Sequence, residues 1–351
     1  KEFQSFDRRS INLPTDYLSR HAIDKSRLVA LLNDFAGLKV CVVGDLIIDE
    51  YITCDPLGMS QEDPTIVVTP VDSTRFIGGA GIVAAHAVGL GAAVQFVSVT
   101  GNDASREYVL ESLAAAKVDA QLLVDPSRPT TLKQRYRCKG KSLLRVSHLH
   151  QGEISVALQK QLLLAFEQTL DDVDLLVFSD FNYGCLPQPV VDQLVVMAKS
   201  HGVLLAADSQ SSSQVGDISR FKGMDLITPT EREARISTRN REDGLVVLAE
   251  QLRQQSSAHN VLLKLGEEGL LIHAGNGKGN GWLTDRVDAL NSAAKDVAGA
   301  GDSLLIASSM TLACGGNIWE AACLGSLAAA VQVGRVGNIP LQLNELLQEL
   351  E

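Results

Sequence analysis

The sequence of 351 residues lacks the features that mark membrane-spanning, secreted and zinc-binding proteins. No apolar run reaches the roughly 18 residues that a membrane span requires. The first 25 residues have no apolar centre of the kind found in signal peptides. The six cysteines form no CxxC pair, and the seven histidines show no zinc-site spacing with them. We therefore expect a cytoplasmic protein whose cysteines are reduced.

Basic residues are too few for general contact with polyanions. Lys and Arg together number 31 against 42 Asp and Glu, which gives a formal net charge of −11. A nucleic acid or an anionic membrane would require a basic face. We expect neither as a partner, and an anionic small substrate would need a local basic pocket.

Apolar runs that alternate with helical patterns make up most of the chain. Runs rich in Val and Leu are typical of strands covered on both faces. Six such runs occur at 39–45, 94–100, 174–180, 203–208, 225–228 and 260–266. Helical stretches separate them, and several end on Gly or Lys as helices often do. This order predicts an α/β fold with a doubly wound, mainly parallel sheet flanked by helices.

Two segments depart from this rhythm, at 51–76 and 128–147. Both are β-prone, more polar and interrupted by Pro and Gly. We predict that they form short strands of a small inserted β flap, or lid, that projects from the main sheet. An open flap exposes strand edges that a second protomer could cover, so we expect a homodimer formed through the flap.

Acidic residues follow several of the predicted strands, namely Asp45, Asp49, Asp180 and Asp208. Ligands of parallel α/β proteins bind beyond the carboxyl ends of the strands, so these residues are candidates for chemistry. Each of them could equally be a turn or helix-cap residue.

The stretch "DVAGAGDSLLIASS" at 296–309 places small residues at the start of a predicted helix that runs to Gly315. Gly299, Ala300 and Gly301 lie where unpaired N–H groups and the helix dipole favour an anion. Asp302 follows, in a position to accept a proton from an attacking hydroxyl. A helix start that binds no ligand fits these residues equally well.

The motif "DVAGAGDS" resembles the signature of the ribokinase-like, or phosphofructokinase-B type, carbohydrate kinases. Other segments match the family in the same order, between about residues 38 and 340. They are "VVGDLIIDEY", "GGAGIVAAHAVGLGA", "VTGND", "SDFNYG", "ITPTEREA" and "LKLGEEGLLI". Within the family, the pattern is most similar to the heptose 7-phosphate kinase domain of the bifunctional heptose kinase/adenylyltransferases. We expect an N-terminal extension with a first helix over 1–37 and a kinase domain over 38–351.

The resemblance implies an enzyme that uses ATP and Mg²⁺ to phosphorylate a hydroxyl of a sugar or sugar phosphate. Asp302 would be the base, and Gly299, Ala300 and Gly301 would form the anion hole. The residues implied for the sugar are Asp49, Gly78, Gly79, Lys133, Arg135 and Arg145. Those implied for the nucleotide are Thr230, Glu233, Lys264, Gly266, Gly269 and Asp296. Glu233 would hold Mg²⁺ through water, and a monovalent cation is a candidate ligand near Asp296. The basic flap residues could instead form a solvated face.

Several ligand positions depart from the family pattern. Ile82 replaces an asparagine after the Gly-Gly pair, and Thr230 replaces the asparagine of Asn-x-x-Glu. Tyr183 and Gln210 stand where the heptose kinases have lysines, and Lys264 replaces a threonine.

Three hypotheses follow from this mixture of intact and altered positions. The first is a sugar or sugar-phosphate kinase, with D-glycero-D-manno-heptose 7-phosphate as the leading substrate and the 1,7-bisphosphate as product. The second is a non-catalytic relative that senses a sugar or nucleotide. The third is a nucleoside kinase.

Overall fold

The computed structural model describes residues 11–211, 214–277 and 281–351, and its main element is a nine-stranded sheet. The strand order is β13-β12-β11-β10-β9-β8-β1-β4-β5. The strands from β5 to β11 are parallel, β12 is antiparallel to β11, and β13 is antiparallel to β12. Their bounds are β1 Lys39–Gly44, β4 Ala93–Thr100, β5 Asp119–Val124, β8 Leu175–Asp180, β9 Leu204–Ser209, β10 Leu226–Ile227, β11 Asn260–Lys264, β12 Leu270–Gly275 and β13 Trp282–Val287. The predicted α/β fold is confirmed.

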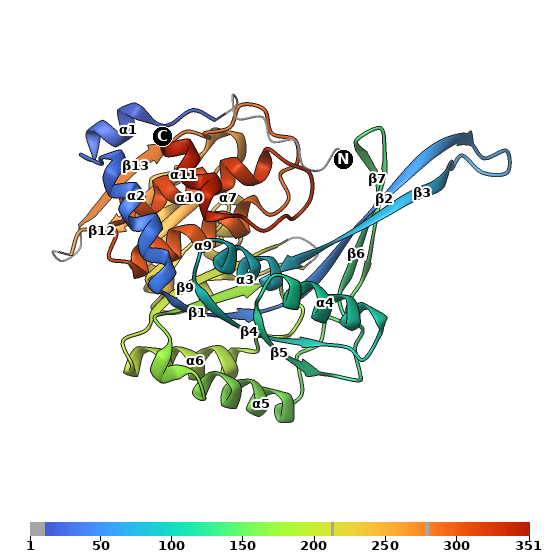
Figure 1. Ribbon diagram of the computed structural model, residues 1–351, viewed down its shortest axis with the longest axis horizontal. Helices are drawn as coiled ribbons and strands as arrows, with labels where there is room; N and C mark the ends of the chain where they lie inside the picture. The colour runs from blue at the N-terminus through green and yellow to red at the C-terminus, as the bar shows by residue number, and fades with distance from the viewer. Residues whose placement is uncertain (1–10, 212–213, 278–280) are drawn as a thin grey trace.

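Helices cover both faces of this sheet (Figure 1). One face packs against α1 Thr15–Arg20, α2 Lys25–Asp34, α3 Ala80–Gly89, α4 Ala104–Ala115, α9 Ala300–Ala313, α10 Ile318–Val333 and α11 Leu343–Leu350. The other face packs against α5 Val156–Glu167, α6 Gln188–Ser200, α7 Glu231–Thr238 and α8 Leu245–Ser256. Short 3₁₀ helices lie at Phe35–Gly37, Leu170–Asp172, Ile218–Arg220 and Gly266–Glu268.

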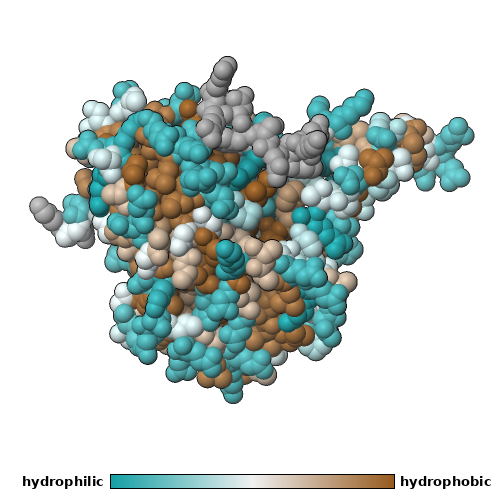
Figure 2. Space-filling view, viewed as in Figure 1, coloured by the Kyte–Doolittle hydropathy of each residue, from teal (hydrophilic) through white to brown (hydrophobic). Residues whose placement is uncertain are grey.

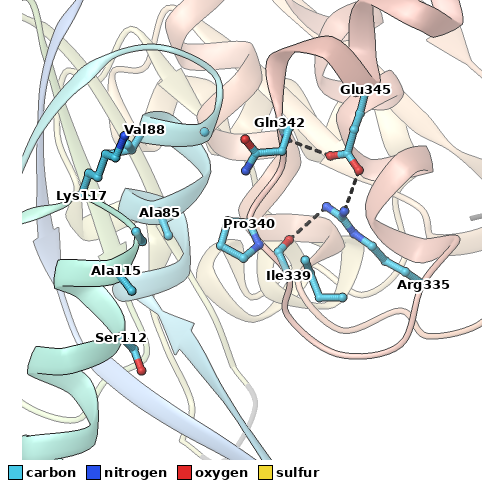
Figure 3. Close-up of a pocket in the computed structure, with 12 residues that line it drawn as sticks. Ala85, Val88, Ser112, Ala115, Lys117, Arg335, Ile339, Pro340, Gln342 and Glu345 are labelled. Atoms are coloured by element: carbon cyan, nitrogen blue, oxygen red, sulfur yellow. Dashed lines mark hydrogen bonds and ion pairs between the residues drawn. The ribbon is translucent and has the colours of Figure 1, made fainter. Parts of the chain in front are cut away.

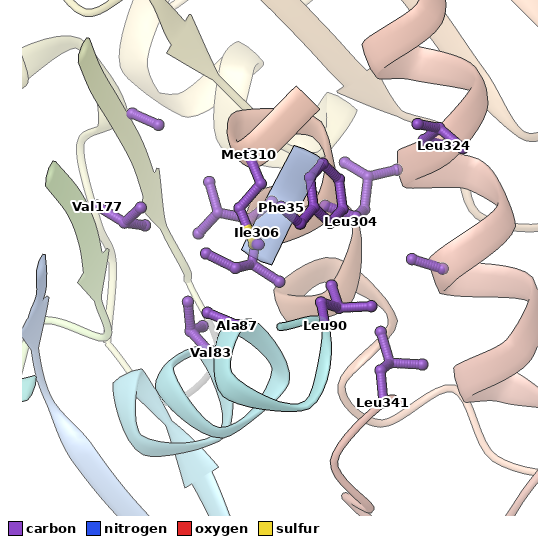
Figure 4. Packing of buried hydrophobic residues seen from close by; sticks show 14 of the residues in the cluster. Phe35, Val83, Ala87, Leu90, Val177, Leu304, Ile306, Met310, Leu324 and Leu341 are labelled. Carbon is purple, nitrogen blue, oxygen red and sulfur yellow. The ribbon is translucent and has the colours of Figure 1, made fainter. Parts of the chain in front are cut away.

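The central strands are apolar throughout because both of their faces are buried. In β1, Val40 and Val42 belong to the core on one face, and Cys41 and Val43 belong to the core on the other. This alternation explains why the sequence shows a continuous apolar run there and not an alternating one. Figure 4 shows the first core, where side chains of α9 meet those of α3 and the sheet. The helix that begins at the glycine loop is therefore anchored along its length.

The predicted flap is a separate four-stranded sheet with the order β3-β2-β6-β7, and it projects from the main body (Figure 1). Its strands are β2 Leu46–Met59, β3 Ile66–Gly79, β6 Leu132–Cys138 and β7 Lys141–His148. The expectation of short strands is wrong for β2 and β3, which have 14 residues each. Pro56 and Gly58 do not end β2, because register shifts near Cys54 and between Pro56 and Gly58 accommodate them within the strand pair. Beyond Thr53 only β3 pairs with β2, so one side of the strand tolerates the missing N–H of Pro56.

The N-terminal segment contains two helices where one was expected. Residues 1–10 of the predicted extension lie outside the described residues. In α1, the hydroxyl of Tyr17 donates to the carbonyl of Trp319 at 2.8 Å, and Leu28 and Leu31 of α2 are fully buried in the first core. The region before residue 38 is thus packed onto the main domain. No helix in the described part of the chain is long and apolar enough to cross a membrane.

Candidate active site

The carboxyl ends of the parallel strands bring the predicted acidic residues to one edge of the sheet, but these residues do different things. Asp45 accepts backbone N–H bonds from Phe181, Tyr183 and Cys185, which fixes the loop after β8. Asp180 accepts bonds from Ser209 and Arg220. The contacts of these two aspartates are therefore structural, as expected of the alternative that they are turn residues. Asp49 and Asp208 instead lie beside the glycine loop that begins α9.

The α9 helix begins as the sequence predicts. Gly299 is its N-cap with a left-handed backbone, at φ 76° and ψ 0°. Asp302 lies in the first turn and is 5% exposed. The side-chain amide of Gln210 donates to Asp302 Oδ1 at 3.0 Å. Gln210 therefore orients the carboxylate that the sequence singled out.

Burial is the main influence on the ionisation of Asp302. The pKa of this carboxyl is raised to about 7, chiefly by burial and also by the nearby carboxylates of Asp208 and Asp49, while Lys264 and Lys133 act in the opposite direction. A carboxyl with a pKa near neutrality can both accept and release a proton under ordinary conditions. The residue has the ionisation expected of a general base.

Lys264 joins the end of β11 to this centre. Its ammonium Nζ lies 2.9 Å from Asp208 Oδ2. The pKa of Asp208 is raised to about 6, chiefly by burial, and the positive charge of Lys264 opposes that rise. On the other side, a Cβ placed on Gly301 would lie 3.1 Å from the Lys264 ammonium, so this group touches the glycine loop.

Thr230 and Glu233 open α7 with a capping box. The Thr230 hydroxyl accepts the N–H of Glu233 at 3.2 Å, and Glu233 Oε2 accepts the N–H of Thr230 at 2.7 Å. The other oxygen, Oε1, accepts the N–H of Ser211 at 2.9 Å. These three bonds hold Glu233 in the first turn of α7, and the N-cap residue Thr230 pairs with Lys264 through an isolated parallel bridge.

A cavity of about 900 Å³ opens beside these residues. It is lined by Thr230, Glu231, Arg232, Arg235, Ile236, Arg239, Arg241, Lys264, Leu265 and Gly266. Arg235 is engaged by Glu231 at 2.8 Å, whereas no hydrogen bond or ion pair ties the side chains of Arg232, Arg239 or Arg241 to other described residues. A cavity of this size with basic walls suits a ligand with several phosphate groups.

Asp49 lies in β2 on the other side of the glycine loop. Asn338 donates to Asp49 Oδ2 at 3.1 Å, and Arg135 Nη2 is 3.8 Å from Asp49 Oδ1. That Oδ1 is buried and accepts no hydrogen bond from described residues. Gly78 packs against the same carboxylate, where a Cβ would collide with Oδ2. The arrangement leaves an acceptor oxygen for a ligand hydroxyl.

Asn338 was missed by the sequence reasoning. Its side chain lies between Asp49 and Gly299, because a Cβ on Gly299 would contact Asn338 Oδ1. The residue is 289 positions from Asp49, and no motif or periodicity in the sequence points to it.

Lys133 couples the flap to both aspartates. Its charge acts to lower the pKa of Asp49 and of Asp302, although burial still raises the pKa of both. The Lys133 ammonium also lies 5.1 Å from the ring centre of Tyr183 and 5.2 Å from that of Phe181. Tyr183 stands where the resemblance implies a lysine, and its ring is in cation–π contact with Lys133. Arg145 is exposed opposite Arg135 on β7.

The remaining predicted positions lie outside this centre or at its border. Asp296 Oδ2 accepts bonds from the Tyr51 hydroxyl and from the N–H of Gly337. Gly266 lines the cavity, while Gly269 packs on the backbone near Val287. Gly79 has a left-handed backbone and lies against the carbonyl of Asp45.

Ile82 is fully buried in the apolar core, so the position of the family's asparagine faces the interior here.

A second cavity, of about 680 Å³, lies away from these residues between α3, the end of α4 and the C-terminal segment (Figure 3). Its buried Arg335 is bonded to Glu345 at 2.9 Å and to the carbonyl of Ile339 at 3.0 Å. Arg335 and Glu345 are thus paired with each other, and none of the predicted site residues lines the cavity.

The described residues contain no group of three or more His, Cys, Asp or Glu side chains that could hold a metal ion on their own. The donor set does include Glu233, which is bonded to the cavity residue Thr230, and the buried Oδ1 of Asp208, which accepts no hydrogen bond from described residues. Carboxylate oxygens suit Mg²⁺, which usually keeps several waters and takes its other ligands from substrate phosphates. These residues therefore fit a magnesium ion that arrives with a nucleotide.

Comparison with protein families gives one match over most of the chain. The model described as "pfkB family carbohydrate kinase" matches residues 38–344. Among curated proteins, the chain is 32% identical over 317 residues to the "Bifunctional protein HldE" of Helicobacter hepaticus, covering 88% of this chain and 63% of that protein. It is 30% identical over 329 residues to the HldE of Paramagnetospirillum magneticum, covering 93% and 66%. The chain thus spans just under two thirds of the length of these relatives.

Solved structures share the fold at lower identity. Escherichia coli phosphofructokinase-2 in complex with substrates and products superimposes with a TM-score of 0.70 at 16% identity, covering 89% of this chain and 98% of the other. Arabidopsis thaliana ribokinase complexed with ribose and ATP gives a TM-score of 0.68 at 17% identity, with coverages of 90% and 98%.

Proposed function

Because the chain belongs to the pfkB family of carbohydrate kinases, we propose that it transfers the γ-phosphoryl group of ATP to a hydroxyl of a sugar phosphate, with Asp302 as the base. One observation carries this proposal. Asp302 is buried at the start of α9 with a pKa raised by burial to about 7, and it lies between Asp49 on one side and Lys264 of the basic cavity on the other. This arrangement suits the transfer of a phosphoryl group from a donor on the Lys264 side to a hydroxyl on the Asp49 side.

In the proposed reaction, Asp302 accepts the proton of the sugar hydroxyl as its oxygen attacks the γ-phosphorus. The new O–P bond forms as the bond from the γ-phosphorus to the bridging oxygen breaks, and ADP leaves with that electron pair. Gln210 holds the Asp302 carboxylate in place through its bond to Oδ1. Gly299, Ala300 and Gly301 lie at the N-terminal end of α9, where the helix dipole and backbone N–H groups would stabilise the charge that develops on the phosphoryl oxygens, although the N–H of Ala300 also makes a 3.4 Å bond to the carbonyl of Val297.

The donor is assigned to the 900 Å³ cavity, with its phosphates toward Lys264 and Gly301. The unpaired guanidinium groups of that wall supply charge for the phosphates. Glu233 is the residue that would hold Mg²⁺ through water, and when bound the ion would neutralise charge on the donor phosphates. We also place a candidate monovalent cation near Asp296, whose carboxylate already orders the backbone of Ala298 and Gly337.

The acceptor is assigned to the Asp49 side of the loop. Asp49 Oδ1 is the oxygen available to a sugar hydroxyl, and Lys133 and Arg135 supply positive charge beside it. These cations favour an acceptor that already carries a phosphate. The leading substrate is D-glycero-D-manno-heptose 7-phosphate, which would give the 1,7-bisphosphate. The resemblance to heptose 7-phosphate kinases and the similarity to HldE proteins support this choice.

We further propose that the active form is a homodimer joined through the flap, in the cytoplasm where ATP is available. Apolar side chains gather on the projecting arm, where brown patches are visible in Figure 2. The exposed apolar residues of the flap are Leu57, Met59, Ile66, Val67, Val71, Leu143 and Leu144. Burying such a surface against a second copy is favourable because it removes apolar area from water.

The test is ADP release with ATP and Mg²⁺ over a panel of heptose 7-phosphate, hexose phosphates, free hexoses, ribose and nucleosides. We expect turnover with sugar phosphates that disappears in Asp302→Asn and persists in Asp171→Asn, whose side chain is 96% exposed. Turnover with nucleosides alone would instead favour a nucleoside kinase. Ligand binding without ADP release would favour a sensor, the reading that Ile82, Tyr183, Gln210 and Thr230 raise.

A further inference from the structure

One cation stands between the donor cavity and the proposed base. Lys264 lines the 900 Å³ cavity with a side chain that is 14% exposed, and its ammonium also touches Gly301 at the start of α9. A group that faces the cavity and contacts the turn that carries Asp302 lies on the path of a phosphoryl group passing between them. This inference rests on the proposed kinase function.

The contacts of the Lys264 ammonium leave it free to bind a ligand. Its one hydrogen bond to described residues is the 2.9 Å bond to Asp208 Oδ2. An ammonium carries three N–H donors, so two donors remain for oxygens of a bound phosphate. Asp208 is itself almost fully buried at the end of β9, and it fixes the direction of the lysine side chain.

The surroundings keep this lysine charged. Burial acts to lower its pKa, but the carboxylates of Asp208, Glu233 and Asp302 outweigh burial, and the net pKa is raised. Lys264 therefore places a positive charge among three carboxylates. Without it, these carboxylates would repel an incoming triphosphate.

Gln210, which follows β9, contacts Asp302 without bringing a charge to it. Its neutral amide donates to Asp302 Oδ1 at 3.0 Å. Lys264, at the end of β11, also acts on Asp302, and it opposes the rise in the pKa of that carboxyl. Gln210 thus bonds to the Asp302 carboxylate, Lys264 acts on it through its charge, and of these two side chains only Lys264 is charged.

We propose that Lys264 is a catalytic residue whose ammonium binds an oxygen of the transferring phosphoryl group and supplies a charge that the neutral Gln210 does not. The lysine stays protonated throughout and forms no covalent bond. It stabilises the negative charge that accumulates on the phosphoryl oxygens as the group passes from ADP to the sugar oxygen.

The kinetic test replaces the charge and then restores it from the other strand. Lys264→Met keeps the length of the side chain without its charge, and Lys160→Met, an exposed lysine on α5, is the matched control. We expect kcat of Lys264→Met to fall at least about 100-fold, as for loss of one preorganised electrostatic contact, with KM for the sugar phosphate changed less than about threefold. The double variant Lys264→Met, Gln210→Lys should regain at least about tenfold in kcat.

A kcat within about threefold of wild type, or a loss confined to KM, would overturn the proposal. Failure of Gln210→Lys to raise kcat would refute the exchange of charge between the two strands. If Lys264→Met does not fold because Asp208 is left unpaired, the pair Asp208→Asn, Lys264→Met removes both charges together. The kcat of this double variant should be at least about 100-fold lower than the kcat of Asp208→Asn alone.

A binding measurement separates this proposal from the proposed function. The probes are ADP and the β,γ-imido analogue of ATP, titrated calorimetrically into wild type and Lys264→Met. Contact with the terminal phosphoryl group predicts a loss of about tenfold or more in affinity for the analogue and less than about threefold for ADP. Equal losses for both, or none, would refute the contact. If wild type phosphorylates no sugar, the proposed function fails, and the titration still decides the role of Lys264; absence of binding by both nucleotides to wild type would overturn both proposals.

Discussion

Replacing the proposed base by its neutral isostere should make the protein more stable while it removes activity. Asp302 is 5% exposed, and burial raises its pKa from the ordinary 3.8 to about 7. A carboxyl whose pKa is higher in the folded state favours folding in its protonated form. This contribution is complete below pH 3.8 and is lost as the pH rises through 7. The asparagine of Asp302→Asn has no carboxyl group to ionise, so the stability of this variant does not fall in this way as the pH rises through 7.

The size of the effect follows from the shift. A difference of about three pKa units corresponds to about 4 kcal/mol, which is the upper limit of the stabilisation of Asp302→Asn over wild type at pH 8. At pH 5 the same arithmetic leaves about 1.6 kcal/mol, because most of the wild-type carboxyl is then protonated in the folded state. For a chain of this size, about 2 °C per kcal/mol gives a rise in Tm of up to about 8 °C at pH 8.

The assay is thermal and urea unfolding of wild type and Asp302→Asn between pH 5 and pH 8. Asparagine keeps the oxygen that accepts the amide of Gln210, so no hydrogen bond is lost. The exposed Asp171→Asn serves as the control and should show no difference that depends on pH. Equal or lower stability of Asp302→Asn at pH 8, or a gap that does not widen with pH, would refute the reasoning.

Three further predictions concern the loop, the acceptor side and the flap. Gly299→Ala should cost about 1–2 kcal/mol in urea unfolding and lower kcat/KM, because φ is 76° and the new Cβ would displace Asn338 from Asp49; wild-type values for both would contradict this. Lys133→Met should raise KM for a sugar phosphate about tenfold or more and leave KM for ATP nearly unchanged; an equal rise in both would count against the acceptor assignment. Leu57→Asp should convert the dimer to a monomer in light scattering, because the residue is 66% exposed on the flap and its burial would be lost; an unchanged mass would place the interface elsewhere.

Much of the fold could be predicted because it depends on local patterns. The runs that became β1, β4, β8, β9, β10 and β11 are apolar on both faces, and this composition distinguishes them from surface strands. The helix from Ile318 to Val333 begins after Asn317 with a capping box and ends before Gly334, as its terminal residues indicate.

Other elements carry weaker signals. The edge strand β5 is exposed along much of its length, so it lacks the continuous apolar run of the central strands. In β2, Pro56 and Gly58 suggest an interruption. The strand nevertheless continues, because beyond Thr53 it pairs only with β3 and no partner on the other side needs the N–H that Pro56 lacks. The sequence does not contain the register that decides this outcome.

The candidate site divides in the same way. Asp302 and the glycine loop were found because a turn before a helix is a local pattern. The bonds from Asn338 to Asp49 and from Gln210 to Asp302 join segments that are far apart in the chain, and only the folded structure brings them together. The resemblance suggested that Gln210 replaces a lysine and loses a contact, whereas the structure shows that Gln210 orients the carboxylate of Asp302.

Phosphorus NMR of a single reaction mixture tests the central claim most directly. Wild type is incubated with ATP, Mg²⁺ and D-glycero-D-manno-heptose 7-phosphate, and Asp302→Asn is incubated in the same way. We expect a new sugar-phosphate resonance from the 1,7-bisphosphate to grow with the ADP signals in wild type, and neither to grow in Asp302→Asn. A new resonance that forms equally in both proteins would show that Asp302 is not the base. ATP that remains unchanged in wild type with this and the other sugar phosphates would contradict the proposed kinase function.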